Sequence, residues 1–71
     1  MYEVGKRATA AIAAKARREG RRTEREYARL GISKQVFSNW KQGKVVPSGY
    51  FLQQMAMAGY DVNYILTGVK K

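Results

Sequence analysis

The chain has 71 residues and carries 14 Lys and Arg against 5 Asp and Glu, a formal net charge of +9. A chain this short makes at most one domain, because below about 80 residues a single core supplies only about 3–5 kcal/mol of net stability. We therefore treat residues 1–71 as one domain. The absence of Cys and His excludes disulfides, thiolate nucleophiles and the usual zinc sites.

The charge and the missing residue types also bear on function. A pI near 10.3 predicts attraction to polyanions, first to nucleic acid and second to an anionic membrane surface. Without His, Cys, a Gly-rich phosphate loop or a suitably placed pair of acids, we expect no enzyme, no cofactor, no metal and no small-molecule substrate. Neither a transmembrane stretch of roughly 18 apolar residues nor a secretory signal is visible. We therefore expect a cytoplasmic protein that is not bound to a membrane.

Hydrophobic spacing and the positions of Gly predict five short helices and no strand, an all-α fold. The first helix covers residues 3–19 and ends at Gly20. Its apolar face is made by Val4, Ala8, Ala11, Ile12 and Ala16. Thr23, followed three residues later by Glu26, is a capping-box pattern and starts a second helix of about eight residues. This second helix ends before Gly31.

The third helix begins after Ser33, which is a favourable N-cap residue, and ends at Gly43. Its inward stripe is expected to contain Val36, Phe37 and Trp40. An aromatic side chain on such a stripe is more often part of the core than a platform for a nucleic-acid base. We therefore expect Trp40 to pack inside the protein.

The fourth and fifth helices follow an extended connection that includes Pro47. Ser48 can cap the fourth helix, and Asp61 can cap the fifth. The residues expected to face inward are Phe51, Leu52, Met55 and Ala56 in the fourth helix and Val62, Ile65 and Leu66 in the fifth. Residues 69–71 are expected to form a frayed tail.

The second and third helices are joined by a short turn that contains Gly31, which is typical of a helix-turn-helix motif. The motif covers about residues 23–42 and presents its second helix to the DNA major groove. The outward side chains of that helix can donate to guanine, pair with adenine or hold a phosphate, and no acid lies among them. The expected base-reading residues are Lys34, Gln35, Ser38 and Asn39.

The segment GISKQVFSNWKQGKVVPS at residues 31–48, followed by DVNYILTG at residues 61–68, resembles the small helix-turn-helix domains of phage CI-type and Cro-type repressors, also called XRE-like. The resemblance covers roughly residues 23–68. It implies a compact five-helix bundle of the lambda-repressor-like type and a phage or prophage repressor in a bacterial host. It also implies a homodimer that binds a palindromic operator in double-stranded DNA.

The resemblance also assigns roles to individual positions. Lys34, Gln35, Ser38 and Asn39 match the base-reading face, and Thr23 and Gln42 match positions that usually touch phosphate. Neighbouring residues are expected to contact phosphates as well, namely Ser33, Lys41, Lys44, Arg21 and Arg22. One position departs from the family, because Tyr27 stands where a small residue usually lets the two helices cross closely.

Several alternatives remain open at this level. The main rival is an antitoxin or a protein-interaction adaptor that uses a basic helical surface, and membrane-surface or RNA binding are weaker rivals. Six arginines lie between residues 17 and 29 with three glutamates interleaved. They form either a solvated surface with intrahelical ion pairs or a set of contacts to the DNA backbone. The dimer surface is not marked in the sequence.

Overall fold

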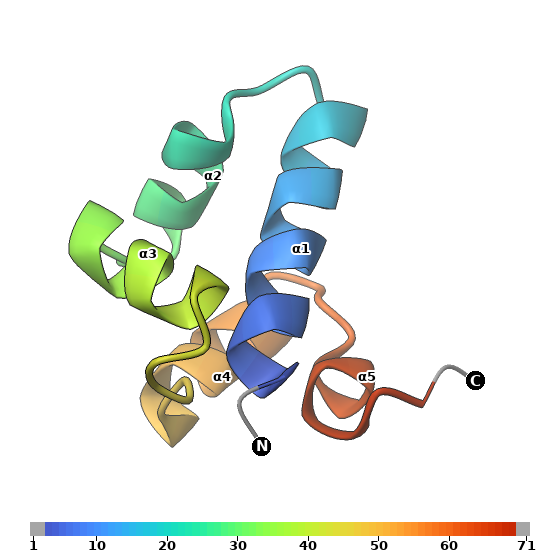
Figure 1. The fold of residues 1–71 in the computed structure, drawn as a ribbon. Coiled ribbons are helices and arrows are strands. Elements are labelled where there is room, and N and C mark those ends of the chain that lie inside the picture. The colour runs from blue at the N-terminus through green and yellow to red at the C-terminus, as the bar shows by residue number, and fades with distance from the viewer. Residues whose placement is uncertain (1–2, 70–71) are drawn as a thin grey trace.

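Five α-helices make up the fold of residues 3–69, which are the residues that the computed structural model describes. They are α1 (Glu3–Arg18), α2 (Thr23–Arg29), α3 (Lys34–Lys41), α4 (Gly49–Met57) and α5 (Val62–Thr67) (Figure 1). The expected all-α fold is confirmed, because this part of the chain contains no strand. Residues 70 and 71 of the expected tail lie outside the described residues.

The sequence signals for the helix ends are partly confirmed. The Ser33 hydroxyl accepts a hydrogen bond from the Val36 backbone N–H (3.2 Å), and the Asp61 carboxylate accepts one from the Tyr64 N–H (3.0 Å). Ser48 stands at the N-cap position of α4 but makes no side-chain cap hydrogen bond. Gly31 adopts a φ of 77°, a left-handed conformation that glycine reaches without steric cost.

The prediction of a capping box at the start of α2, made by Thr23 and Glu26, is wrong. The N-cap residue of α2 is Arg22, and it makes no side-chain cap hydrogen bond. The Glu26 carboxylate is instead buried, with the Lys15 ammonium 3.8 Å away and the Arg21 guanidinium 3.4 Å away. An acid at this position pairs with cations from α1 and from the preceding turn, and this ionic contact replaces the reciprocal cap.

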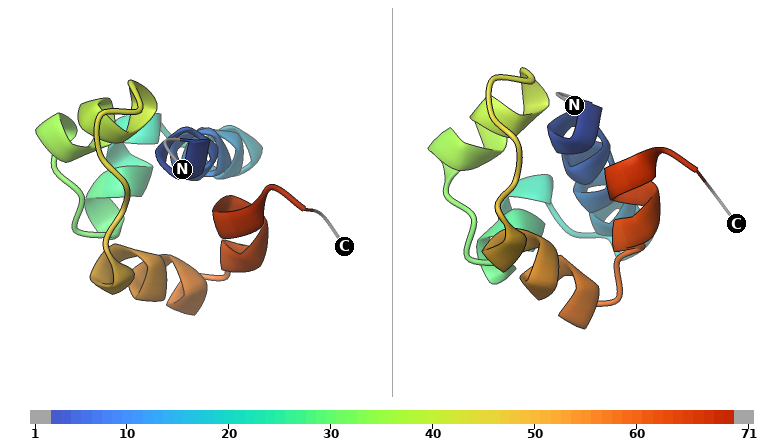
Figure 2. Two further views of the ribbon diagram at one scale, coloured as in Figure 1. Left: turned by 60° about the horizontal axis from the view of Figure 1, so that its bottom comes forward. Right: turned by 90° about the horizontal axis from the view of Figure 1, so that it is seen from below.

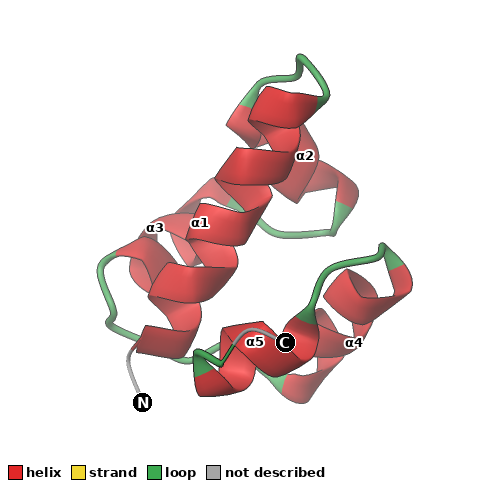
Figure 3. Ribbon diagram, turned by 90° about the vertical axis from the view of Figure 1, so that its right-hand side faces the viewer, coloured by secondary structure: helices red, strands yellow, loops and turns green. Residues whose placement is uncertain are grey.

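The helices form two layers, one made by α1, α2 and α3 and the other by α4 and α5 (Figure 3). α1 packs against α2, α3 and α5, and α2 also contacts α3. Figure 2 shows α3 and α5 on different sides of α1, and Figure 3 shows α4 and α5 side by side. The radius of gyration is 10.9 Å, close to the value of about 11 Å expected for a folded chain of this length.

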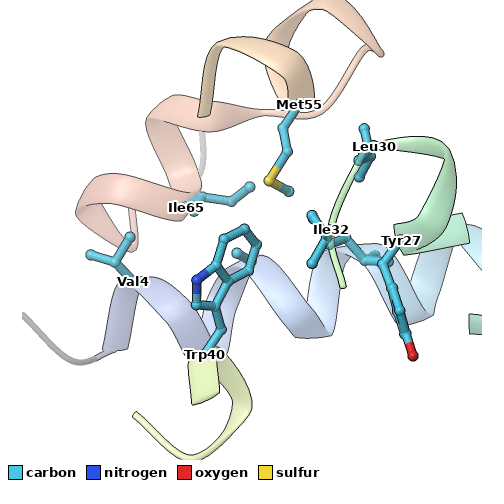
Figure 4. Close-up of a cluster of buried hydrophobic side chains, with 9 residues drawn as sticks. Val4, Tyr27, Leu30, Ile32, Trp40, Met55 and Ile65 are labelled. Atoms are coloured by element: carbon cyan, nitrogen blue, oxygen red, sulfur yellow. The ribbon is translucent and has the colours of Figure 1, made fainter. Parts of the chain in front are cut away.

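The hydrophobic core lies between these layers (Figure 4). The Trp40 side chain points into its centre and is only 2% exposed, so its expected role in packing is confirmed. The other buried core residues are Val4, Ala8, Ile12, Tyr27, Leu30, Ile32, Met55 and Ile65. Two expectations are wrong, because Ala56 is exposed and Leu66 is 47% exposed. Short helices at the edge of a small domain bury only a narrow stripe.

α1 and the end of α3 approach each other closely at Gly5. A Cβ atom at this position would lie 2.8 Å from the Trp40 carbonyl oxygen and 3.1 Å from the Val45 carbonyl oxygen. Both neighbours are backbone atoms, which cannot rotate away. The close crossing that needs a small residue is therefore that of α1 with α3, at Gly5, whereas Tyr27 stacks on Phe37 between α2 and α3.

A second long-range contact fastens α5 to α1. The Arg7 guanidinium donates from Nε to the Ile65 carbonyl oxygen (2.8 Å) and from Nη2 to the Leu66 carbonyl oxygen (3.2 Å). A cation at the C-terminal end of a helix, here α5, satisfies otherwise unpaired carbonyl groups and interacts favourably with the helix dipole. Within residues 3–69, none of the helices is long and apolar enough to cross a lipid bilayer.

Candidate nucleic-acid interface

A groove with a volume of about 650 Å³ lies between α1, α2 and α3. Its lining residues are Lys6, Thr9, Ala10 and Ala13 from α1, Thr23 and Tyr27 from α2, and Lys34, Phe37, Ser38 and Lys41 from α3. Four residues assigned to DNA contacts from the sequence are therefore brought together on one surface. These are Thr23, Lys34, Ser38 and Lys41.

The groove is positively charged at its rim and apolar below. Lys6, Lys34 and Lys41 supply the charge, and none of the described residues that line the groove is acidic. The rings of Tyr27 and Phe37 stack with their centroids 4.3 Å apart and an interplanar angle of 22°. This stack ties α2 to α3 and fixes the spacing between the two helices.

The exposed side of α3 carries a second stripe of polar side chains beside the groove. Gln35 Nε2 donates a hydrogen bond to Asn39 Oδ1 (3.4 Å), and Gln42 Nε2 donates one to the Ser38 hydroxyl (3.2 Å). Each pair is four residues apart and therefore lies on one face of the helix. The amides of Gln35 and Asn39 are thus aligned side by side on the face that was expected to read bases.

Two further predicted contact residues lie at the ends of α3. Ser33 is exposed, and its oxygen is occupied by the cap hydrogen bond, which leaves the hydroxyl proton free to donate. Lys44 is exposed in the turn after α3, where its backbone N–H donates to the Asn39 carbonyl oxygen (2.9 Å). Both side chains can therefore reach an anion beside the helix.

Arg21 and Arg22 are not part of the groove. Both side chains are exposed, and Arg21 forms ion pairs with Glu19 and with Glu26. Arg21 instead lines a separate hollow of about 380 Å³ with Arg25, Ala28 and Arg29. Of the predicted phosphate-contact residues, Thr23 and Lys41 therefore line the groove and Arg21 lines the hollow, whereas Arg22 lines neither.

Lys6 is the charged groove residue that was missing from the sequence prediction. It lies on the stripe of α1 that continues through Thr9, Ala10 and Ala13, next to the stripe that enters the core. A lysine followed at helical spacing by small side chains could have indicated that this stripe of the helix lines a groove, since small residues let another helix approach.

Among residues 3–69, Tyr60 is the ionisable group with a shifted pKa. Burial, together with the nearby carboxylates of Glu26 and Glu19, raises its pKa to about 12 against a lowering contribution from Arg18. Its hydroxyl oxygen is buried and has no hydrogen-bond partner among the described residues. Within residues 3–69 no group of three or more acidic, Cys or His side chains could hold a metal ion.

We compared the chain with protein-family models, with curated proteins and with solved structures, and it matches none of them significantly.

Proposed function

We propose that this protein is a sequence-specific DNA-binding transcriptional regulator of the lambda-repressor-like helix-turn-helix type. In this proposal α2 and α3 are the motif, and α3 enters the major groove. The observation that carries the proposal is the groove with three lysines and no acid, directly beside the aligned amides of Gln35 and Asn39.

The two surfaces have different roles. Gln35 and Asn39 carry amides that can pair with adenine, and Lys34 and Ser38 can donate to guanine or to a backbone oxygen. Lys41, Lys44 and Lys6 neutralise phosphates, which supplies affinity that does not depend on sequence. The hydroxyls of Thr23 and Ser33 and the amide of Gln42 add neutral donors along the same backbone.

One helix of eight residues reads only a few base pairs. We therefore propose a homodimer on a palindromic operator, with the two half-sites about one helical turn apart. A phage or prophage repressor that acts on DNA in the cytoplasm of a bacterial host fits this arrangement. The basic surface would also suit an antitoxin or adaptor, but a polar helix face with paired amides favours DNA.

The proposal is tested by measuring the affinity for random-sequence duplex DNA over a range of salt concentrations. Replacing Lys6 and Lys41 by Ala should weaken binding to every duplex and reduce the salt slope by about 0.9 for each phosphate contact that is lost. The matched control replaces Arg17 and Arg18, two exposed arginines outside the groove. An equal effect of both double variants would contradict the assignment of the groove.

A further inference from the structure

The hollow formed by α2 on its outer side is a second basic surface, distinct from the groove. It has a volume of about 380 Å³ and is lined by Arg21, Arg25, Ala28 and Arg29. It shares no lining residue with the groove between α1, α2 and α3. We call these four residues the arginine hollow.

The arginine hollow and the groove lie on opposite faces of α2. A helix turns by about 100° per residue, so Arg25 is about 200° from Thr23, and Arg29 is about 200° from Tyr27. Thr23 and Tyr27 line the groove, whereas Arg25 and Arg29 line the hollow. A ligand in the hollow therefore contacts the side of α2 that faces away from the groove.

The positive charge of the hollow is not balanced inside the protein. Arg25 and Arg29 are exposed and form no ion pair or hydrogen bond with any residue in the range 3–69. Like charges four residues apart on a helix repel each other and destabilise it. Of the three arginines of the hollow, Glu19 and Glu26 pair only with Arg21, so Arg25 and Arg29 are left available for an anion from outside.

The chemistry of the hollow favours a nucleic-acid backbone over a protein. All six basic residues between positions 17 and 29 are arginine, whereas the three between 34 and 44 are lysine. Guanidinium groups bind phosphate through two parallel hydrogen bonds, which a lysine cannot form. The only apolar lining residue is Ala28, and protein interfaces usually need larger apolar or aromatic anchors.

We infer that the arginine hollow binds the phosphate backbone of a second segment of duplex DNA. A molecule that holds one duplex at α3 can then bring another segment against α2. The bridging of two segments rests on the proposed function of α3, but the phosphate contact of the hollow does not. Arg25 and Arg29 lie about 6 Å apart along α2, a distance that spans about two neighbouring phosphates of one strand, and Arg21 adds a third guanidinium from the turn before the helix.

The test uses beads that carry one 20-bp random-sequence duplex and a fluorescent duplex of the same kind in solution, at about 0.05 M salt. The protein should retain the fluorescent duplex on the beads. The R25A/R29A variant should lose more than about four-fifths of this signal while it still binds the beads to within about twofold. The R17A/R18A variant removes the same charge outside the hollow and should keep more than half of the signal.

The remaining outcomes separate the two proposals. Protein that binds the beads but captures no second duplex would overturn the second site and leave the function of α3 standing. Unchanged capture by R25A/R29A, or equal loss in R17A/R18A, would also overturn it. A parallel assay offers fluorescent polyglutamate instead of the fluorescent duplex. If the R25A/R29A variant loses capture of polyglutamate and the R17A/R18A variant does not, the hollow is a site for acidic protein and the DNA proposal is overturned. If the wild type does not bind the beads at all, both proposals fail.

Discussion

The ring of Tyr27 on α2 stacks on the ring of Phe37 on α3, with the centroids 4.3 Å apart. Tyr27 is 7% exposed, and its hydroxyl end points away from the core centre (Figure 4). A large residue is accommodated at this helix crossing because it provides the contact that spaces the two helices. The orientation of α3 therefore depends on an aromatic pair.

Replacing Tyr27 by Ala should lower the free energy of unfolding by about 3 kcal/mol, since it removes a buried ring and leaves Phe37 without its partner. Replacing it by Phe keeps the ring and should change the stability by less than about 0.5 kcal/mol. Urea denaturation of both variants measures the difference. A similar loss in the two variants would show that the hydroxyl, and not the stacked ring, holds the helices together.

Replacing Gly5 by Ala should destabilise the protein by about 2 kcal/mol, because the new methyl group would press on the backbone oxygen atoms of Trp40 and Val45. The matched control is Gly49→Ala in α4, where a Cβ atom meets nothing within 4 Å. That change should stabilise the protein by about 0.5 kcal/mol. Thermal unfolding curves that shift in the same direction for both variants would contradict the close approach of α1 and α3.

Tyr60 makes stability depend on pH in the alkaline range. Its pKa is raised from 10.0 to about 12 in the folded protein, so between these values the unfolded chain releases the proton first. Stability conferred by the protonated hydroxyl is therefore complete below pH 10 and is lost as the pH rises through 12.

The Tyr60→Phe variant lacks this titration and should resist alkaline unfolding better than the wild type. At pH 8 it should be at least as stable as the wild type, because the change removes a buried hydroxyl without a partner. The difference in urea midpoint should then grow in favour of the variant between pH 8 and pH 11. A constant difference over this range would rule out the assigned pKa.

Local signals in the sequence were sufficient to predict the five helices and the positions of most of their ends. Ser33 and Asp61 cap α3 and α5 because the cap depends on four consecutive residues and not on the rest of the fold. The stripe that buries Trp40 could likewise be recognised from spacing alone. These features depend on short stretches of chain, which the sequence displays directly.

Features that depend on neighbours distant in sequence were missed. The role of Gly5 follows from the approach of residues 40 and 45, and nothing near it in the sequence indicates this contact. Glu26 fits a capping box locally, but Lys15 from another helix competes for its carboxylate. Lys6 joins the candidate site only because α1 lies beside α3. Tertiary packing decides each of these positions.

The measurement that tests the proposed function most directly is selection of bound sites from random duplex DNA at about 0.15 M salt, with the wild type and Gln35→Ala in parallel. The account predicts a palindromic motif for the wild type with half-sites about one helical turn apart. The variant should lose preference at one or two positions in each half-site while its affinity for random duplex stays nearly unchanged. No enrichment by the wild type, or the same motif from both proteins, would contradict the account.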